Sequence, residues 1–114
     1  MKATIWHNPR CSKSRQALAI LEERPGVEIE VVEYLKTPPS RAEIEATLKK
    51  AGVAPSQAVR KGESVAREIG LDTEDDTAAL NAMAEHPILI ERPIVITEKG
   101  AVIARPPEKA NEVL

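Results

Sequence analysis

The sequence predicts an α/β fold in which a βαβ unit and a ββα unit flank a helical segment. Residues 3–31 show strand, helix and strand patterns in turn, with short joints between them. Residues 40–86 show only helical patterns, and residues 93–104 contain two apolar runs separated by a hairpin-length loop. A chain of 114 residues that is 42% apolar has the length of one domain with a real core. We therefore expect a single domain over residues 1–114.

The first part of the chain predicts two parallel strands joined by a helix. Residues 3–7 are a short, mostly apolar run that ends at Asn8-Pro9, as a buried strand does before a turn. From Cys11 to Arg24 the apolar residues recur at helical spacing, and Pro25-Gly26 ends this helix. Apolar and acidic residues then alternate over residues 27–31, which predicts a second strand. A helical crossover normally makes the two strands parallel.

The middle of the chain predicts helices alone. Ser40-Arg41-Ala42-Glu43 is a capping box, and Gly52 closes the helix that this box begins. Pro55 suits the first turn of a further helix, and Gly70 suits the end of another. Asp72-Thr73 is the expected N-terminal cap of a third helix. We expect these helices to form an insertion between the two β segments.

The last part of the chain predicts a hairpin followed by a helix. Residues 93–97 and 101–104 are two strands, and the short apolar run at residues 87–90 is assigned to neither. Pro107 suits the first turn of a final helix. The order βαβ, helices, ββα is the connectivity of a thioredoxin-like fold with a helical insertion between its halves.

Composition and charge exclude several classes of protein. One cysteine forms no internal disulfide, and His7, His86 and Cys11 lack the spacing of metal ligands, so we expect no metal site. A net charge of −2 argues against nucleic-acid binding. No apolar run approaches the length of a membrane span, and the N-terminal residues do not resemble a signal peptide. We expect a cytoplasmic protein without a membrane partner.

Cys11 lies directly after the first strand and loop, where a helix begins. Free amides and the helix dipole favour negative charge at this position, and the thiolate is the reactive form of cysteine. Arg10, Lys13 and Arg15 surround Cys11, although cations oppose the dipole at a helix N-terminus. A lone cysteine is otherwise more often a small buried apolar residue. The position and the surrounding charge favour a reactive thiol.

Two neighbours of Cys11 each have two interpretations. Ser14 completes a Cys-x-x-Ser pattern, so its hydroxyl could donate a hydrogen bond to the thiolate, or it could simply occupy the first helical turn. His7 could lower the thiol pKa or move a proton, or it could be a histidine at a strand end that bonds to the backbone. The spacing alone leaves both pairs of alternatives open.

Four segments of the chain together resemble a known family. They are His7–Arg15, Tyr34-Leu35 with Pro38–Ser40, His86–Val95, and Arg105-Pro106. In this order they resemble the glutaredoxin-linked arsenate reductases, the ArsC-like branch of the thioredoxin superfamily. The basic loop around Cys11 is similar to that of the short chromosomal members. The resemblance covers essentially the whole chain.

The resemblance implies roles for particular residues. Cys11 would be the nucleophile, and three arginines would bind the oxyanion, at the positions of Arg60, Arg92 and Arg105. Pro93 occupies the place of the cis-proline of the thioredoxin fold. Arsenate would be the substrate, with glutathione as co-substrate and glutaredoxin as protein partner, and with no bound cofactor. A planar guanidinium suits this role because it binds two oxygens of a tetrahedral anion at once.

Two other functions remain open at this point. The chain could be a general glutathione-linked oxidoreductase that acts on mixed disulfides and needs no arginine triad. It could also be a non-catalytic regulator that responds to redox state. For arsenate reduction and for mixed-disulfide reduction alike, a chain with a single cysteine needs a second thiol from another molecule.

Overall fold

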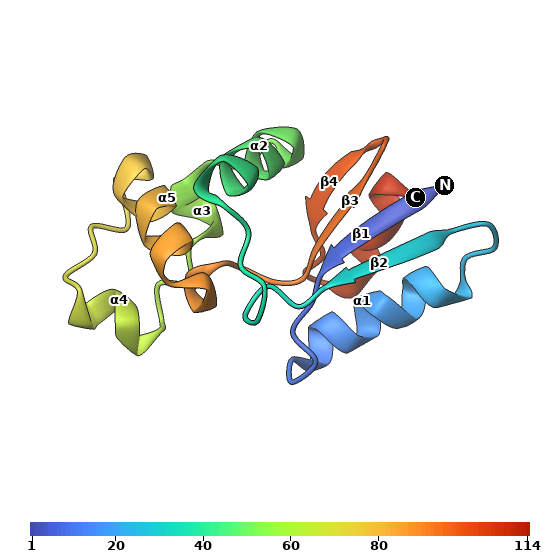
Figure 1. Ribbon diagram of the computed structural model, residues 1–114, viewed down its shortest axis with the longest axis horizontal. Helices are drawn as coiled ribbons and strands as arrows, with labels where there is room; N and C mark the ends of the chain where they lie inside the picture. Colours follow the sequence, from blue (N-terminus) through green and yellow to red (C-terminus); the bar gives the residue numbers. More distant parts are fainter. The chain divides into compact units, whose positions relative to one another are not determined.

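The computed structural model describes residues 1–114 and divides into two compact units (Figure 1). The first unit comprises Met1–Thr37 and Arg92–Leu114, and the second comprises Pro38–Glu91. The helical insertion that we expect at about residues 40–86 falls within the second unit. That the whole chain behaves as one domain stays a prediction.

The first unit contains a four-stranded sheet in the order β2-β1-β3-β4 (Figure 1). The predicted crossover is confirmed, because β1 and β2 are parallel, whereas β1–β3 and β3–β4 are antiparallel. The α/β fold predicted from the sequence is therefore correct, with strand ends that differ by about one residue. The strands are β1 (Lys2–Trp6), β2 (Glu28–Val32), β3 (Ile94–Thr97) and β4 (Gly100–Ile103).

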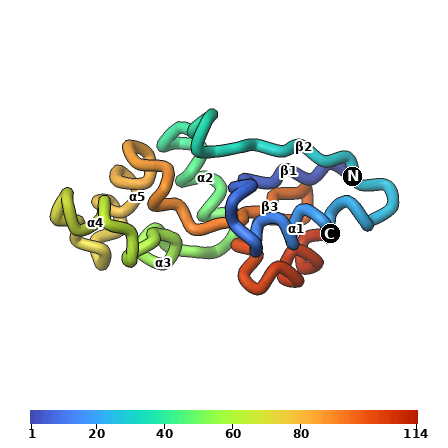
Figure 2. The backbone as a smooth tube through the Cα atoms, turned by 90° about the horizontal axis from the view of Figure 1, so that it is seen from below, coloured from blue at the N-terminus to red at the C-terminus, as the bar shows by residue number.

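Two helices supply the core against this sheet. Helix α1 (Ser12–Glu23) packs against η2 (Pro107–Val113), and Figure 2 shows both on the same side of β1. The expected final helix is a 3-10 helix, in which the N–H of Lys109 donates to the carbonyl oxygen of Pro106 three residues earlier. Buried aliphatic side chains join the sheet to these helices: Ala3, Ile5, Ala17, Leu21, Val95, Ala104, Ala110, Val113 and Leu114.

Strand β2 departs from the alternation that its sequence suggests. Val27 and Ile29 pack against the core, as their spacing predicts, but Val31 is 46% exposed. The reason is position in the sheet, because β2 is an outer strand with a neighbour on one side only. An apolar residue on such a strand is covered only where a helix reaches it.

The second unit is helical, as predicted. In the capping box of its first helix, the Glu43 N–H donates to Ser40 Oγ at 3.1 Å and the Ser40 N–H donates to Glu43 Oε1 at 3.0 Å. Gly52 ends that helix with φ 69°, a left-handed conformation that glycine adopts without strain. The helices are α2 (Arg41–Ala51), α3 (Pro55–Ala58), α4 (Ser64–Glu68), α5 (Asp76–Glu85) and η1 (Pro87–Leu89).

The cap of α5 differs from the expectation. The N-cap is Asp75, whose side chain accepts the Ala78 N–H at 3.0 Å, and not Asp72-Thr73. Asp72 instead accepts the Glu74 N–H at 3.0 Å in the preceding turn. Glu74, Asp75 and Asp76 are three consecutive acidic residues, and because α5 begins at Asp76, the residue directly before it is the cap.

No helix in the structure combines the length and the apolar character needed to cross a bilayer.

Candidate active site at Cys11

Three segments of the first unit meet at one edge of its sheet because of strand register. Trp6, the last residue of β1, lies opposite Ile94, the first residue of β3, and Ile94 lies opposite Ile103 at the end of β4. The residues that follow β1, precede β3 and follow β4 therefore emerge at the same edge. These residues include Cys11, Arg92 and Arg105.

Cys11 is the N-cap residue of α1. Its backbone N–H donates to the carbonyl oxygen of Asn8 at 3.0 Å, and its own carbonyl accepts the N–H of Arg15 at 3.0 Å. Cys11 is partly buried, and its side chain does not cap the helix with a hydrogen bond. The sulfur thus lies where the unpaired amides of the first helical turn point.

Burial raises the pKa of the Cys11 thiol, but four other influences outweigh burial, so this pKa falls below its ordinary value. The backbone N–H of Ser14 is the strongest of these, followed by the positive charge of Arg92. The backbone N–H of Lys13 and the side chain of Arg105 also favour the thiolate. The arrangement increases the fraction of Cys11 present as thiolate, which is the nucleophilic form.

Arg92 and Arg105 lie together beside Cys11. A terminal nitrogen of the Arg105 guanidinium donates to the backbone carbonyl oxygen of Arg92 at 3.0 Å, and both side chains are partly buried. The Arg92–Pro93 peptide bond is cis, and so is the bond between Arg105 and Pro106. Two of the three arginines named from the resemblance thus reach the thiol electrostatically.

Arg60 belongs to the second unit, where its guanidinium is occupied locally. One nitrogen of Arg60 lies 2.7 Å from a carboxylate oxygen of Glu63, and another donates to the Ile88 carbonyl oxygen at 3.4 Å. The side chains of Arg60 and Glu63 are only 21% and 24% exposed. Any role of Arg60 with an oxyanion stays a prediction.

His7 and Ser14 form a buried pair next to the Cys11 loop. His7 Nδ1 and Ser14 Oγ are 2.6 Å apart and share a hydrogen bond, and Ser14 Oγ also accepts the Asn8 N–H at 3.0 Å. Burial is the main reason that the pKa of His7 is lowered; Glu33 opposes this lowering and Arg15 adds to it. His7 is therefore predominantly neutral near pH 7.

The geometry separates two parts of Ser14 that the sequence pattern combines. The Ser14 hydroxyl faces His7 and Asn8, whereas the Ser14 backbone N–H faces the thiol. Sequence reasoning expected free backbone amides to favour negative charge at Cys11, and the structure identifies them as those of Ser14 and Lys13. The N-cap position explains which amides act on the thiol, since the second and third amides of a helix point back to this position. Sequence reasoning missed Asn8, whose N–H donates to Ser14 Oγ and ties the loop to the helix.

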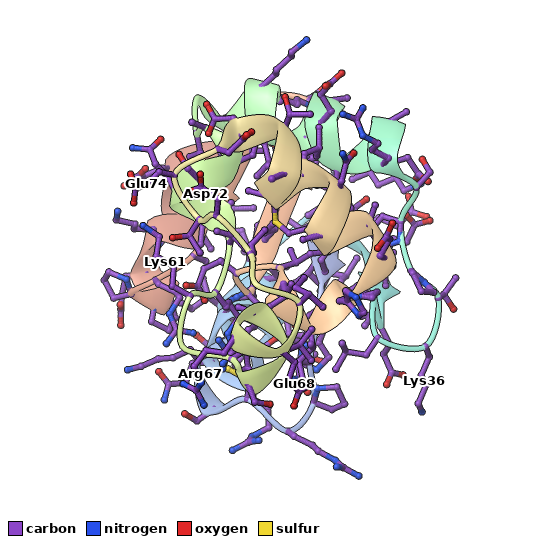
Figure 3. The ribbon with its side chains drawn as sticks, turned by 90° about the vertical axis from the view of Figure 1, so that its left-hand side faces the viewer. Lys36, Lys61, Arg67, Glu68, Asp72 and Glu74 are labelled. Atoms are coloured by element: carbon purple, nitrogen blue, oxygen red, sulfur yellow. The ribbon has the colours of Figure 1, made fainter.

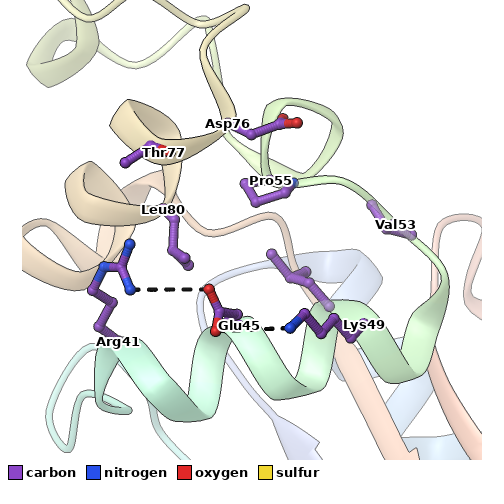
Figure 4. A pocket seen from close by; sticks show the side chains of 9 residues that line it. Arg41, Glu45, Lys49, Val53, Pro55, Asp76, Thr77 and Leu80 are labelled. Carbon is purple, nitrogen blue, oxygen red and sulfur yellow. Dashed lines mark ion pairs between the residues drawn. The ribbon is translucent and has the colours of Figure 1, made fainter.

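No group of three or more His, Cys, Asp or Glu side chains is placed to hold a metal ion. A separate cavity of about 220 Å³ lies within the second unit, between α2 and α5 (Figure 4). Its charged residues are engaged nearby, since Glu45 lies 3.9 Å from both Arg41 and Lys49, and Asp76 accepts the Ser56 N–H. We assign it no role.

Comparison with known proteins places this geometry in a family. The family model described as "ArsC family" matches residues 6–113. An arsenate reductase of Rhizobium meliloti is 46% identical over 116 residues, covering 100% of this chain and 82% of that protein. An arsenate reductase of Neisseria meningitidis is 47% identical over 113 residues and covers 96% of each chain. The solved structure of an arsenate reductase from Vibrio cholerae has a TM-score of 0.91 at 42% identity, covering 100% of this chain and 98% of that one.

The match extends through the Cys11 loop, the β3–β4 hairpin and the whole helical segment between them. The solved relative also shares the fold along the full length of this chain. On this evidence the chain belongs to the ArsC family.

Proposed function

We propose that this chain reduces arsenate to arsenite with Cys11 as the nucleophile. The observation that carries the proposal is a thiol of lowered pKa with two guanidinium groups, those of Arg92 and Arg105, beside it. Guanidinium groups recognise tetrahedral oxyanions through paired hydrogen bonds. Relatives at 46% and 47% identity are named arsenate reductases, which supports the same substrate.

The proposed reaction has three steps that balance in atoms and electrons. The Cys11 thiolate attacks arsenic, a sulfur–arsenic bond forms, and one arsenate oxygen leaves as water after protonation. An external thiolate then attacks the Cys11 sulfur, so that a disulfide forms while the sulfur–arsenic bond breaks. The bonding electron pair stays on arsenic and reduces it from arsenic(V) to arsenic(III). A further thiol exchanges with the mixed disulfide and returns the Cys11 thiolate.

We propose glutathione as the external thiol and glutaredoxin as the protein that completes the exchange. The reason is that the chain has a single cysteine and supplies no second thiol of its own. Such chemistry needs a compartment in which free thiols persist, and we propose the cytoplasm.

The test is a coupled assay in which arsenate-dependent oxidation of NADPH is measured with glutathione, glutathione reductase and glutaredoxin. Cys11→Ser is expected to abolish turnover. Arg92→Gln and Arg105→Gln are each expected to lower kcat/KM for arsenate on the order of a hundredfold, because each removes a donor aimed at developing charge. Lys2→Gln, at the far end of β1, is the matched control and should leave turnover unchanged.

The assay also separates the other two functions. A general thiol oxidoreductase would reduce mixed disulfides with glutathione, and Arg92→Gln would change that rate only as far as it changes the thiol pKa of Cys11. A non-catalytic regulator would turn over neither arsenate nor a mixed disulfide. Arg60→Gln is tested in the same assay, and a loss of arsenate turnover would support the role that the family resemblance implies for Arg60. Retained arsenate turnover in Cys11→Ser would refute the proposed function.

A further inference from the structure

The exposed surface beside Cys11 carries basic side chains without acidic partners. Arg10 directly precedes Cys11, and Lys13 lies in the first turn of α1; both side chains are exposed. Neither forms an ion pair with a carboxylate. We call these two residues the cationic rim.

The folding of α1 does not account for the cationic rim. The first turns of α2 and α5 contain an acidic residue, Glu43 and Asp76 respectively, whereas the first turn of α1 contains none. Negative charge stabilises this end of a helix and positive charge destabilises it. Basic residues here are therefore unfavourable for the helix, and an anionic ligand would offset that cost.

Several other exposed lysines of the chain do have acidic partners. Lys2 lies 3.5 Å from Glu30, and Lys36 lies 3.5 Å from Glu33. In the second unit Lys61 lies 3.3 Å from Glu74, and Figure 3 shows the two side chains on the same part of the surface. Arg10 and Lys13 lack such a partner, as do the exposed Arg67 and Lys109, so the cationic rim is distinguished by its position beside the sole thiol.

The two arginines and the cationic rim differ in burial and in what they reach. Arg92 and Arg105 are partly buried and act on the thiol itself, so they suit the oxyanion that reacts there. Arg10 and Lys13 are exposed, and their side chains are not among the groups that lower the thiol pKa. Their charges are therefore available to a second anion that approaches from solvent.

We propose that the cationic rim selects anionic thiols as the co-substrate that attacks the Cys11 adduct. The proposal rests on the proposed function, in which an external thiolate attacks the Cys11 sulfur. Glutathione has two carboxylates and one ammonium group, so its net charge is opposite to that of the rim. Opposite charges raise the encounter rate and orient the approaching molecule. Arg10 and Lys13 thereby become specificity-determining residues for the thiol and not for arsenate.

The test measures disulfide exchange at Cys11 without arsenate. Cys11 thiolate attacks dithiobis(nitrobenzoate), an aromatic disulfide with a carboxylate on each half; a new disulfide forms and thionitrobenzoate leaves. The same reaction is measured with the uncharged disulfide dithiodipyridine. The ratio of the two rate constants reports the preference for anions, because any change in thiol pKa affects both reactions.

The Arg10→Gln/Lys13→Gln double variant is expected to lower this ratio about five- to twentyfold, since each unit charge near contact contributes about fivefold in water. Added salt should lower the wild-type ratio and change the double variant's ratio much less. Lys2→Gln is the matched control and should keep the wild-type ratio. An unchanged ratio in the double variant overturns the proposal.

A second measurement distinguishes failure of this proposal from failure of the proposed function. When arsenite formation is measured directly, the double variant should have a lower kcat/KM for glutathione than the wild type but the same rate with the neutral thiol mercaptoethanol. If the wild type reduces no arsenate while its exchange ratio responds to Arg10 and Lys13, the arsenate assignment is wrong and the rim is supported. If arsenate reduction is normal and both thiols are affected equally, the rim does not select the thiol.

Discussion

At the scale of single residues, the thiol of Cys11 is controlled more by backbone than by side chains of its own motif. The Ser14 N–H contributes more to the thiolate than either neighbouring arginine, although Arg92 and Arg105 add to it. A helix N-terminus offers such amides to whatever group occupies the N-cap. The reactivity of the cysteine is therefore a consequence of where α1 begins.

The lowered pKa of the Cys11 thiol predicts how the reactivity of Cys11 and the stability of the fold depend on pH. Alkylation of Cys11 by iodoacetamide should reach half its maximal rate at a pH below the ordinary thiol pKa, and Arg105→Gln should move that midpoint upward. Between the lowered pKa of the folded state and the ordinary pKa of the unfolded state, the unfolded chain binds more protons. The free energy of unfolding, relative to Cys11→Ser, should therefore rise with pH across that window.

The comparison with Cys11→Ser is made by urea unfolding at a series of pH values, since a serine hydroxyl does not titrate there. Lys2→Gln serves as the control for the alkylation midpoint and should match the wild type. A difference in stability that is constant with pH would contradict a lowered thiol pKa.

A second residue-scale prediction concerns the Ser14 hydroxyl. Ser14→Ala leaves His7 Nδ1 and the Asn8 N–H without their buried partner, so it should lower the free energy of unfolding by about 1–3 kcal/mol. The thiol midpoint should move little, because the Ser14 N–H remains in place. Urea unfolding and thiol alkylation measure the two effects. A large upward shift of the midpoint without loss of stability would show that the hydroxyl itself acts on the thiolate.

At the scale of elements, the helices differ in how their first turns are satisfied. Helices α2 and α5 each have an N-cap side chain that accepts a backbone N–H. Ser40 is this residue in α2, and Asp75 is this residue in α5. Helix α1 has Cys11 at the equivalent position, and the Cys11 side chain forms no capping hydrogen bond. The first turn of α1 therefore keeps amides available for the thiolate. In α2 and α5 an amide of the first turn bonds to the capping side chain, which stabilises the helix.

The cap of α5 gives a test with a matched control in the same loop. Asp75→Ala should lower the free energy of unfolding by about 1 kcal/mol, because the Ala78 N–H loses its acceptor. Asp72→Ala removes an equal charge but only the turn bond to Glu74, so its effect should be smaller. Urea denaturation followed by circular dichroism measures both. Equal losses would mean that charge, and not capping, decides the stability of this helix.

At the scale of the whole molecule, each unit has its own buried apolar residues. The first unit buries Leu21 and Ile5 against the sheet, and the second buries side chains from α2 and α5, including Ile44, Leu48 and Met83. With no phenylalanine in the chain, these cores are built almost entirely from aliphatic side chains. Their stability therefore depends on close packing of branched residues.

Two leucines of the first unit provide the corresponding test. Leu21→Ala should lower the free energy of unfolding by about 2–5 kcal/mol, because Leu21 is fully buried and its loss leaves a cavity. Leu35→Ala deletes the same atoms from a side chain that is 43% exposed, and it should change stability by no more than about 0.5 kcal/mol. Urea unfolding checks both variants. Comparable losses would contradict the assignment of Leu21 to the core.

The order of the elements, the capping box at Ser40 and the place of Cys11 at the start of a helix were all determined by the sequence. These features follow from hydrogen bonds and side-chain spacing within a few residues, so a linear pattern contains them. The convergence of Cys11, Arg92 and Arg105 was decided only by the tertiary structure, because it depends on the register of β1 against the β3–β4 hairpin, which lies far along the chain. The same holds for the Ser14 hydroxyl, which faces His7 because β1 and α1 meet there. It also holds for Val31, which is exposed because β2 is an outer strand.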